Sequence, residues 1–532
     1  MSRRTSLPSR VTTVALSGTA VLALSASVLI GASGVSSAAP ASPSDSSGAV
    51  SYAATKAAES AFQAAVTNAD PVACQRPAPD NRVSTTIHCY TPNQIRAFYG
   101  LDPLTPQTTQ GEGQTIVLVD SYGTPTGAED LAFFAKTFNG PTPDYEAAYP
   151  LGKPDYKNPP GQGNGTSGPT AADGWAGEAT LDIEWAYAIA PKAHIVLLAT
   201  PPAETQGVQG LPNLMKAIDW GIDRYPSGTV FSMSFGTNEA AFASPAAAKN
   251  AFARFDQTFI RGQAKGDTFL SSSGDNGTQG VTRAHKQTVT APDPEVSYPN
   301  VSPYVTSVGG TQVQSGWTWN PSQDKPFNDD GSRNPLYWAW TPSGSSQAVW
   351  NESWASIATG GGLSTVYPRP AYQDSVANVV GTHRGVPDVA WNAAVNGGVL
   401  VYSSYYPRIN GSPLWGVYGG TSASSPQVAA LTAIGNQWRR VYGHKGPIGD
   451  LNKAIYSASF VKSAAFSDIV PRTYGTTPSG VLQNNRLWDL GADGFVTPDP
   501  VPGYPTTVGY DLTTGWGSPQ GFGYVDNLLN QP

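Results

Sequence analysis

Two acidic side chains, Glu178 and Asp182, stand four residues apart in the stretch GEATLDIEWAYAIAP, residues 177–191. The stretch has the apolar spacing of a helix that ends at a proline, so both carboxyl groups fall on one helix face, one turn apart. On an exposed helix, such a pair of like charges costs about 0.2–0.5 kcal/mol. Taken alone, the spacing fits a solvated helix face as well as a catalytic pair.

A third candidate, Ser422, lies in WGVYGGTSASSPQVAALTAIGNQW, residues 415–438, which predicts a strand, a tight glycine turn and a helix. Ser422 falls at the turn, where the N–H groups and positive end of the helix would face an oxyanion. The structural alternative is a helix N-cap, a role that Ser424 or Ser425 before Pro426 fills equally well. The length of the G-T-S-A-x-x-P string favours a nucleophile.

A serine nucleophile needs a base, usually a histidine. Subtilisin-type proteases share this serine motif and carry their histidine at the start of a helix between the first strand and the serine. Here His383 comes late and precedes VPDVAWNA rather than a long apolar helix, and His194 begins a predicted strand. We therefore expect core or surface roles for the histidines. The five are His88, His194, His285, His383 and His444.

Short apolar runs rich in β-branched residues alternate with helical patterns. This alternation predicts an α/β fold, doubly wound, with a mostly parallel sheet and helices on both faces. Active sites of such folds gather at the carboxyl ends of the strands. Asp275, in LSSSGDNG, follows one of the expected strands. The expected strands are 115–120, 194–200, 229–236, 268–275 and 305–310, and the expected helices are 178–190, 212–223 and 245–265.

The beginning of the chain predicts export. Residues 1–39 combine a basic start, an apolar run and a small-residue cleavage site, as a signal peptide does. A membrane anchor is the weaker alternative, because Ser, Thr and Gly interrupt the apolar run and no later stretch is long enough to span a bilayer. The Ala- and Ser-rich residues 40–89 are a linker or a remnant prosegment. We therefore expect a secreted, extracellular protein.

The predicted export also bears on the oxidation state of the two cysteines. An oxidising compartment favours a disulfide between Cys74 and Cys89, with two unpaired thiols as the alternative. Closing a loop of about 15 residues contributes roughly 3 kcal/mol in the chain-entropy account. The formal net charge of −7 excludes a nucleic-acid footprint, and charged residues make up only 13% of the chain. We expect a monomer that binds neither nucleic acid nor, once the signal peptide is removed, a membrane.

The composition and the pattern of apolar runs in residues 90–532 are typical of one compact domain. Two stretches within it have the composition of surface insertions. Residues 317–344 are rich in Trp and Pro, and residues 471–503 form a long irregular segment. Clustered Trp could bind carbohydrate or peptide, and a locally packed loop is the alternative.

The combination of G-E-x-x-L-D-x-E, S-S-G-D-x-G and G-G-T-S-A-x-x-P resembles the sedolisin family, the serine-carboxyl peptidases. The stretches YTPNQIRAFYG, VSYPNVSPYVTSVGGT, TGGGLS and RGVPDVAWNA resemble it too, so the likeness covers about residues 90–532. It implies a subtilisin-like fold, a triad of Glu178, Asp182 and Ser422, and Asp275 at the oxyanion hole.

The chemistry of these residue types agrees with that assignment. Two close carboxyls cannot both ionise cheaply, so one can take the serine proton while its neighbour holds another. Asp275 stabilises an oxyanion only as a protonated donor, which acid favours. Asp120 matches an outer acid of the family, whereas Phe235 stands where the family often has a Trp and offers no N–H donor. Glu184 lies on roughly the opposite side of the helix and is expected to be structural or solvated.

The segments FSDIV (466–470) and TTVGYDLTTGWGSP (506–519) resemble the calcium-binding segment of the family. On the bare sequence the second is only a turn signal. Two carboxylates with carbonyl oxygens suit Ca²⁺. The resemblance implies one structural ion, bound by the side chains of Asp468 and Asp511 and the carbonyls of Ile469, Thr507 and Gly509.

The sequence thus predicts a secreted, acid-acting serine-carboxyl peptidase that hydrolyses peptide bonds through an acyl-enzyme on Ser422. Glu178 would be its general base and acid, Asp182 the partner of Glu178, and Asp275 the oxyanion donor. An endopeptidase is preferred over a tripeptidyl-peptidase, because no sequence feature clearly blocks the substrate groove. The alternatives are a His-dependent subtilisin-like protease using Asp120, and a catalytically dead secreted binding protein on the same scaffold.

Overall fold

The fold is described from a computed structural model of the 532-residue chain. It describes residues 72–77, 84–101, 110–156, 169–201, 204–284, 287–313, 347–352, 355–405, 414–461, 463, 465–471, 473–474, 477–478, 483–490 and 496–532. The predicted signal peptide, most of the predicted linker and the Trp-rich stretch 317–344 lie outside the described residues. In the part that is described, no helix combines the length and apolarity needed to cross a membrane.

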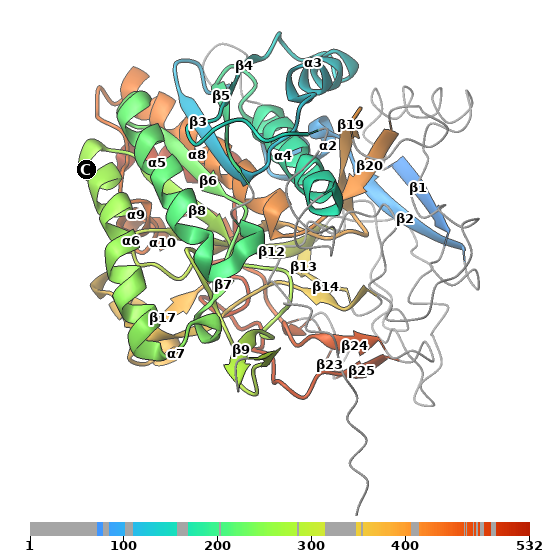
Figure 1. The fold of residues 1–532 in the computed structure, drawn as a ribbon. Coiled ribbons are helices and arrows are strands. Elements are labelled where there is room, and N and C mark those ends of the chain that lie inside the picture. Colours follow the sequence, from blue (N-terminus) through green and yellow to red (C-terminus); the bar gives the residue numbers. More distant parts are fainter. Residues whose placement is uncertain are drawn as a thin grey trace, which may run out of the picture.

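The centre of the molecule is an eight-stranded sheet in the order β13-β12-β8-β6-β3-β5-β4, with β18 also paired to β12 (Figure 1). All neighbouring pairs are parallel except β12 with β13, so the predicted mostly parallel sheet is confirmed. Its strands are β3 (Thr115–Ser121), β4 (Asp144–Ala148), β5 (His194–Thr200), β6 (Val230–Met233), β8 (Thr268–Ser272), β12 (Thr306–Val313), β13 (Gln347–Val349) and β18 (Val389–Asn392).

Helices cover both faces of this sheet, as the alternation of elements predicts. One face carries α5 and α6, which lie side by side in Figure 1, and the other carries α4 and α8 with α3 and α11 outside them. Each expected helix is present, although α4 begins earlier than its apolar spacing indicates. The helices are α2 (Pro92–Phe98), α3 (Gly127–Thr137), α4 (Pro169–Ile189), α5 (Leu211–Arg224), α6 (Pro245–Lys265), α7 (Ala377–Val380), α8 (Thr421–Val441), α9 (Leu451–Ile455), α10 (Ala458–Val461) and α11 (Gly521–Asn530).

Side chains of each central strand alternate between two apolar cores. In β3, Ile116 and Leu118 join the core beneath α4 and α8, whereas Val117 and Val119 join the core beneath α5 and α6. By the same alternation, Asp120 at the carboxyl end of β3 faces the α4 and α8 side. The pleat of a buried strand therefore directs an acid toward the helices that carry Glu178 and Ser422.

A second, smaller sheet has the order β1-β2-β19-β20, built from β1 (Val72–Pro77), β2 (Ser84–Tyr90), β19 (Gly398–Ser403) and β20 (Leu414–Tyr418). In the hairpin of β1 and β2, Cys74 stands opposite Ile87 and Cys89 opposite Val72. Cys89 is fully buried. The side chain of Cys74 lies outside the described residues, so the Cys74–Cys89 disulfide remains a prediction.

Strand β19 is held along its edge by side chains from α3 and α4. The indole N–H of Trp185 donates to the carbonyl of Leu400 at 2.8 Å, and Glu184 Oε2 accepts from the backbone N–H of Tyr402 at 3.0 Å. Both carboxylate oxygens of Asp130 accept from the N–H of Ser404 at 3.1 Å. Glu184 is fully buried, which excludes the solvated alternative and leaves the structural one.

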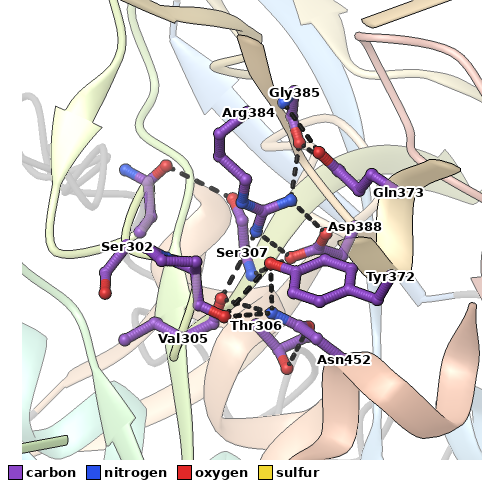
Figure 2. Close-up of polar contacts among 12 residues, drawn as sticks. Ser302, Val305, Thr306, Ser307, Tyr372, Gln373, Arg384, Gly385, Asp388 and Asn452 are labelled. Atoms are coloured by element: carbon purple, nitrogen blue, oxygen red, sulfur yellow. Dashed lines mark hydrogen bonds and ion pairs between the residues drawn. The ribbon is translucent and has the colours of Figure 1, made fainter. Parts of the chain in front are cut away.

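A buried polar network beside the sheet joins β12, β17 (His383–Val386) and α9 (Figure 2). The guanidinium of Arg384 donates to both oxygens of Asp388, with Nη1–Oδ1 at 2.6 Å and Nη2–Oδ2 at 2.5 Å. Asp388 also accepts from the N–H of Ser307 at 2.8 Å and the hydroxyl of Tyr456 at 2.7 Å. The network fixes the residue immediately before β18.

The remaining elements are short. Part of the predicted insertion 471–503 lies within the described residues and packs near the central loops, since Thr278 Oγ1 donates to the carbonyl of Pro502 at 2.8 Å. The short strands are β7 (Thr237–Asn238), β9 (Val281–Ala284), β10 (Gln287–Thr290), β11 (Ser297–Tyr298), β14 (Asn351–Glu352), β15 (Ile357–Ala358), β16 (Gly362–Pro368), β21 (Phe466–Ser467), β22 (Thr473–Tyr474), β23 (Thr477–Pro478), β24 (Trp488–Leu490), β25 (Val496–Pro498) and β26 (Ser518–Pro519). The 3-10 helices are η2 (Glu204–Gln209), η3 (Glu239–Ala241) and η6 (Ala371–Val376).

Candidate active site

Glu178 and Asp182 lie on α4, on the side of the helix that packs against α8. Their side chains are 4% and 0% exposed, so the interpretation of the pair as a solvated helix face is wrong. Oε1 of Glu178 and Oδ1 of Asp182 have no hydrogen-bond partner. A buried carboxylate without a counter-charge is costly. We therefore expect at least one of these two neighbouring carboxyl groups to be protonated.

Ser422 is the second residue of α8, whose first residue, Thr421, directly follows the glycine pair of the predicted tight turn. Gly420 has φ of 102°, a left-handed backbone that favours glycine. Ser422 is fully buried and its hydroxyl has no hydrogen-bond partner of good geometry. The hydroxyl nevertheless lies close enough to Glu178 to favour the ionised form of that carboxyl. A hydroxyl beside a buried carboxyl is the arrangement of a nucleophile and its base.

Asp275 follows the carboxyl end of β8 and meets α8 at the residue before Ser422. Its Oδ1 accepts from the backbone N–H and the hydroxyl of Thr421, each at 2.8 Å. Its Oδ2 is buried and has no partner. Burial raises the pKa of Asp275 to about 7, and the two bonds from Thr421 oppose that rise. One oxygen is thus anchored while the other is available to carry a proton.

Asp120 completes a cluster of four buried carboxyl groups. It is fully buried, and neither of its oxygens has a hydrogen-bond partner. Burial raises its pKa to about 8. Asp182 has one anchor, since Ser234 Oγ donates to its Oδ2 at 2.8 Å. Phe235, which follows Ser234, is fully buried and provides no donor to this cluster.

The neighbouring acids raise the pKa values of Glu178 and Asp182. The pKa of Glu178 stands well above its ordinary value, first through burial and then through the charges of Asp182, Asp120 and Asp275. The pKa of Asp182 is also well above its ordinary value, through burial and the charge of Asp120. The structure therefore brings together all the predicted catalytic residues, in surroundings that retain protons in acid.

The described histidines lie elsewhere. Nδ1 of His194 lies 3.0 Å from Asp144, and its Nε2 lies 3.3 Å from Glu146, at the amino ends of β4 and β5. His383 and His444 are exposed. The side chains of His88 and His285 are outside the described residues. The hydroxyl of Ser422 bonds to no histidine in the part of the chain that is described.

Beside Asp275 lies a small pocket whose walls, apart from Phe235, are polar or made of small residues. It lies between the loop after β8, the loop after β6 and the segment before β12. Asn300 is 1% exposed, and its Nδ2 has no partner. The residues that carry its chemistry are Asn238, Asp275, Glu295, Ser297 and Asn300.

Sequence reasoning missed several contributors to this site. Thr421 stands inside the quoted serine motif, yet the motif gave no sign that it would hold Asp275. Ser234 lies next to Phe235, the position at which the chain departs from the family. Glu295 and Asn300 lie in irregular segments between strands, where no spacing rule applies, so only the tertiary fold brings them to the pocket.

The predicted calcium ligands come together near the C-terminus. The N–H of Gly509 donates to Asp468 Oδ2 at 2.7 Å, and the N–H of Thr507 donates to Asp511 Oδ2 at 3.0 Å. Among the described residues, no hydrogen bond ends on the carbonyls of Ile469, Thr507 or Gly509. This set of hard oxygen donors fits Ca²⁺. Across the described part of the chain, no three His, Cys, Asp or Glu side chains are grouped to hold a metal by themselves.

Comparisons with known proteins give consistent results, although no family model matches the chain. Kumamolisin of Bacillus sp. (strain MN-32) is 28% identical over 449 residues, which cover 83% of this chain and 64% of kumamolisin. Aorsin of Aspergillus oryzae is 27% identical, covering 81% and 63% of the two chains. The chain therefore spans somewhat less than two thirds of the length of these relatives.

Two further matches carry the name sedolisin. The sedolisin of Pseudomonas sp. (strain 101) is 29% identical over 269 residues, 49% of this chain and 35% of that protein. A solved structure of Pseudomonas sedolisin, a serine-carboxyl proteinase complexed with pseudo-iodotyrostatin, aligns with 83% of this chain and 98% of its own at a TM-score of 0.57 and 22% identity. That alignment confirms the subtilisin-like α/β fold. The motifs, the fold and these relatives together confirm that the chain resembles the sedolisin family of serine-carboxyl peptidases.

Proposed function

We propose that this protein is an acid-acting serine-carboxyl peptidase that cleaves proteins or peptides through an acyl-enzyme on Ser422. The single observation that carries the proposal is the unbonded hydroxyl of Ser422 beside a buried, proton-retaining carboxyl, Glu178. The similarity of the chain to kumamolisin and aorsin supports the same reaction.

In the first step, Ser422 Oγ attacks the peptide carbonyl carbon as its proton passes to Glu178. Asp182, held by Ser234, carries the companion proton and limits the charge on the pair. The carbonyl oxygen becomes an oxyanion that receives a hydrogen bond from protonated Asp275 Oδ2. Collapse of the tetrahedral intermediate breaks the C–N bond, and Glu178 returns the proton to the leaving amine.

In the second step, water attacks the acyl-enzyme. Glu178 takes one proton from that water, and the same oxyanion site stabilises the second tetrahedral intermediate. The ester bond to Ser422 then breaks, and Glu178 returns the proton to the serine oxygen. Acid is required because two groups, the Glu178–Asp182 pair and Asp275, must each hold a proton.

The triad is tested by single and double substitutions. Glu178→Ala and Ser422→Ala should each lower kcat at pH 4 by at least about 10³-fold, because each removes a group on which every proton transfer depends. The double variant should be scarcely slower than either single variant, because members of a triad act as a unit. Losses that multiply would contradict the assignment, and circular dichroism of each variant checks its folding.

The cleavage mode is proposed to be that of an endopeptidase. Incubation with a mixed peptide library at pH 4 and pH 7.5, followed by sequencing of the products, distinguishes the possibilities. Internal cuts in acid support the proposal, whereas release of tripeptides alone indicates a tripeptidyl-peptidase. Cleavage at pH 7.5 that a single His→Ala substitution abolishes would favour the His-dependent alternative, and no cleavage at either pH would favour a binding protein. Secretion is proposed with this activity on the signal-peptide pattern of residues 1–39.

One structural Ca²⁺ is proposed at Asp468, Asp511 and the carbonyls of Ile469, Thr507 and Gly509. A divalent cation would bridge the carboxylates of exposed Asp468 and buried Asp511 and neutralise both, so its removal should destabilise the fold. EDTA should lower the Tm, and Asp511→Ala should abolish the response to EDTA. A wild-type Tm that ignores both EDTA and added Ca²⁺ would rule the ion out.

A further inference from the structure

The pocket beside Asp275 is tied to the nucleophile by the backbone. Its wall includes residues 273–277. The N–H of Gly274 donates to Thr421 Oγ1 at 3.0 Å, and Asp275 bonds the same threonine, which precedes Ser422. A substrate carbonyl that bonds to Asp275 Oδ2 therefore brings its own residue to the mouth of this pocket. The side chain on the carbonyl side of the scissile bond is the group that the pocket can receive.

The chemistry of the pocket favours a substrate side chain that donates hydrogen bonds. Its described lining includes the carboxyl groups of Asp275 and Glu295 and no lysine, arginine or histidine. The buried Asn300 amide with an unpartnered Nδ2 indicates that a polar group or water enters. The one large apolar residue of the lining, Phe235, is fully buried in the adjoining core, so the polar groups give the pocket its chemistry.

Glu295 is anchored on one side only. The backbone N–H of Ala240 donates to its Oε2 at 3.1 Å, and the N–H of Glu295 itself donates to the carbonyl of Thr278 at 2.9 Å. Among the described residues, no hydrogen bond or ion pair engages its Oε1. Its orientation is thus fixed while one oxygen remains available to a ligand.

We infer that Glu295 is a specificity-determining residue that favours substrates with arginine or lysine on the carbonyl side of the scissile bond. The inference rests on the proposed peptidase function and deepens it. A guanidinium or ammonium group in this pocket would pair with Glu295 Oε1.

The charge on Glu295 gives the preference a pH dependence. Burial raises the pKa of Glu295 to about 7, the N–H of Ala240 opposes that rise, and the nearby acids Glu239 and Asp293 add to it. Asp275, in the wall of the same pocket, is a further acid, and Asp499 bonds the pocket residue Gln279. Because a neutral carboxyl attracts a cation less than a carboxylate does, the preference for basic side chains should grow from pH 4 to pH 6.

The test compares two peptides that differ at one position, arginine in one and citrulline in the other. Citrulline has nearly the shape of arginine and keeps N–H donors, but it carries no charge. The ratio of their kcat/KM values cancels the pH dependence of the catalytic groups, which acts on both peptides alike. We expect a ratio of about 10-fold or more at pH 6, the scale of a hydrogen-bonded charge, and a smaller ratio at pH 4.

Glu295→Gln keeps an oxygen for the Ala240 N–H and removes only the charge. It should bring the ratio close to 1 at every pH, with cleavage of the citrulline peptide retained. Asp293→Asn is the matched control, because it removes an exposed acid two residues away that does not line the pocket. This variant should keep most of the wild-type ratio and its rise with pH.

Cleavage of both peptides by the wild type with a ratio near 1 at all pH values would overturn the inference and leave the peptidase proposal standing. A high ratio that Glu295→Gln does not change would also overturn it. Cleavage of neither peptide by folded wild-type protein would overturn both proposals. Because the wild-type ratio is itself informative, the test does not depend on the folding of any variant.

Discussion

At the scale of single residues, the site consists of acids whose environment decides their protonation. Glu178, Asp182 and Asp275 were identified from spacing and from motifs, and the structure places them together. What the sequence could not predict is their burial, because α4 has apolar or small residues on every side and only packing shows which face is enclosed. The solvated alternatives for the pair and for Glu184 were wrong for this reason.

The role proposed for Asp275 can be tested by changing its protonation. Wild-type kcat/KM should fall as the pH rises through about 7, because ionised Asp275 would repel the oxyanion. Asp275→Ala should lose about 10²–10³-fold in acid, the usual scale for one oxyanion-hole donor. Asp275→Asn keeps N–H donors at every pH and should retain measurable activity.

Asp275→Asn should also lose less activity than the wild type between pH 4 and pH 6. The gain is partial, since the Glu178–Asp182 pair sets an alkaline limit of its own. The measurement is kcat/KM against pH for the three proteins on one peptide. Identical profiles for the alanine and asparagine variants would remove Asp275 from the oxyanion site.

At the scale of elements, buried polar contacts hold the segments that carry the site. Asp388 links Arg384 of β17 to the N–H of Ser307 in β12, as Figure 2 shows, and its own carbonyl accepts from the N–H of Trp516 at 3.0 Å. Asp388 directly precedes β18, and the carbonyl of Ala393, just beyond that strand, accepts from the N–H of Gly420. The network therefore connects the C-terminal loop to the turn that presents Ser422.

Breaking this ion pair from one side should be more costly than removing it whole. Asp388→Leu should cost about 3–5 kcal/mol of unfolding free energy, because it leaves the charge of Arg384 buried without a partner. The double variant Arg384→Met/Asp388→Leu should recover part of that loss. Urea denaturation measures both. A double variant no more stable than Asp388→Leu would contradict the prediction.

The exposed pair of Lys453 and Asp450 provides the control. Its N–O distance is 3.0 Å, but the lysine side chain is 76% exposed. Lys453→Met should therefore change the unfolding free energy by less than about 1 kcal/mol, the range of solvent-exposed pairs. A loss of unfolding free energy as large as that of Asp388→Leu would show that burial is not the reason why the Arg384–Asp388 pair contributes strongly to stability.

At the scale of the whole molecule, raised carboxyl pKa values should make the fold most stable in acid. Asp120 and Asp275 have pKa values raised by burial to about 8 and about 7, whereas in an unfolded chain they titrate near 3.9. Between these limits the folded state binds more protons than the unfolded state, so the unfolding free energy falls as the pH rises. Their contribution is complete below about pH 4 and lost through pH 7–8.

Urea denaturation at pH 4, 6 and 8 measures this slope. Asp120→Asn removes one titrating group while keeping its size, so it should flatten the decline between pH 6 and pH 8. A wild-type stability that rises over this range would contradict the prediction. An unchanged slope in Asp120→Asn would show that Asp120 does not carry a proton in the folded state.

The central sheet could be predicted because its strands are continuous apolar runs separated by helices. The expected strand 194–200 coincides with β5, and the expected helix 245–265 with α6. The second sheet could not be predicted, since β2 pairs with β19 across most of the chain. Short strands that pair at such separation leave no local pattern, and their register depends on packing that forms only in the folded protein.

The side chains along β19 have a consequence for how copies of this protein meet. An open strand edge is a template on which the strand of another molecule can form a ladder. Along this edge, Trp185, Glu184 and Asp130 occupy backbone groups of Leu400, Tyr402 and Ser404, every second residue. Because those backbone groups are already hydrogen-bonded, a strand of a neighbouring molecule cannot pair with them. Helix α4, which carries two of the proposed catalytic acids, therefore acts with Asp130 of α3 to protect the protein against edge-to-edge aggregation.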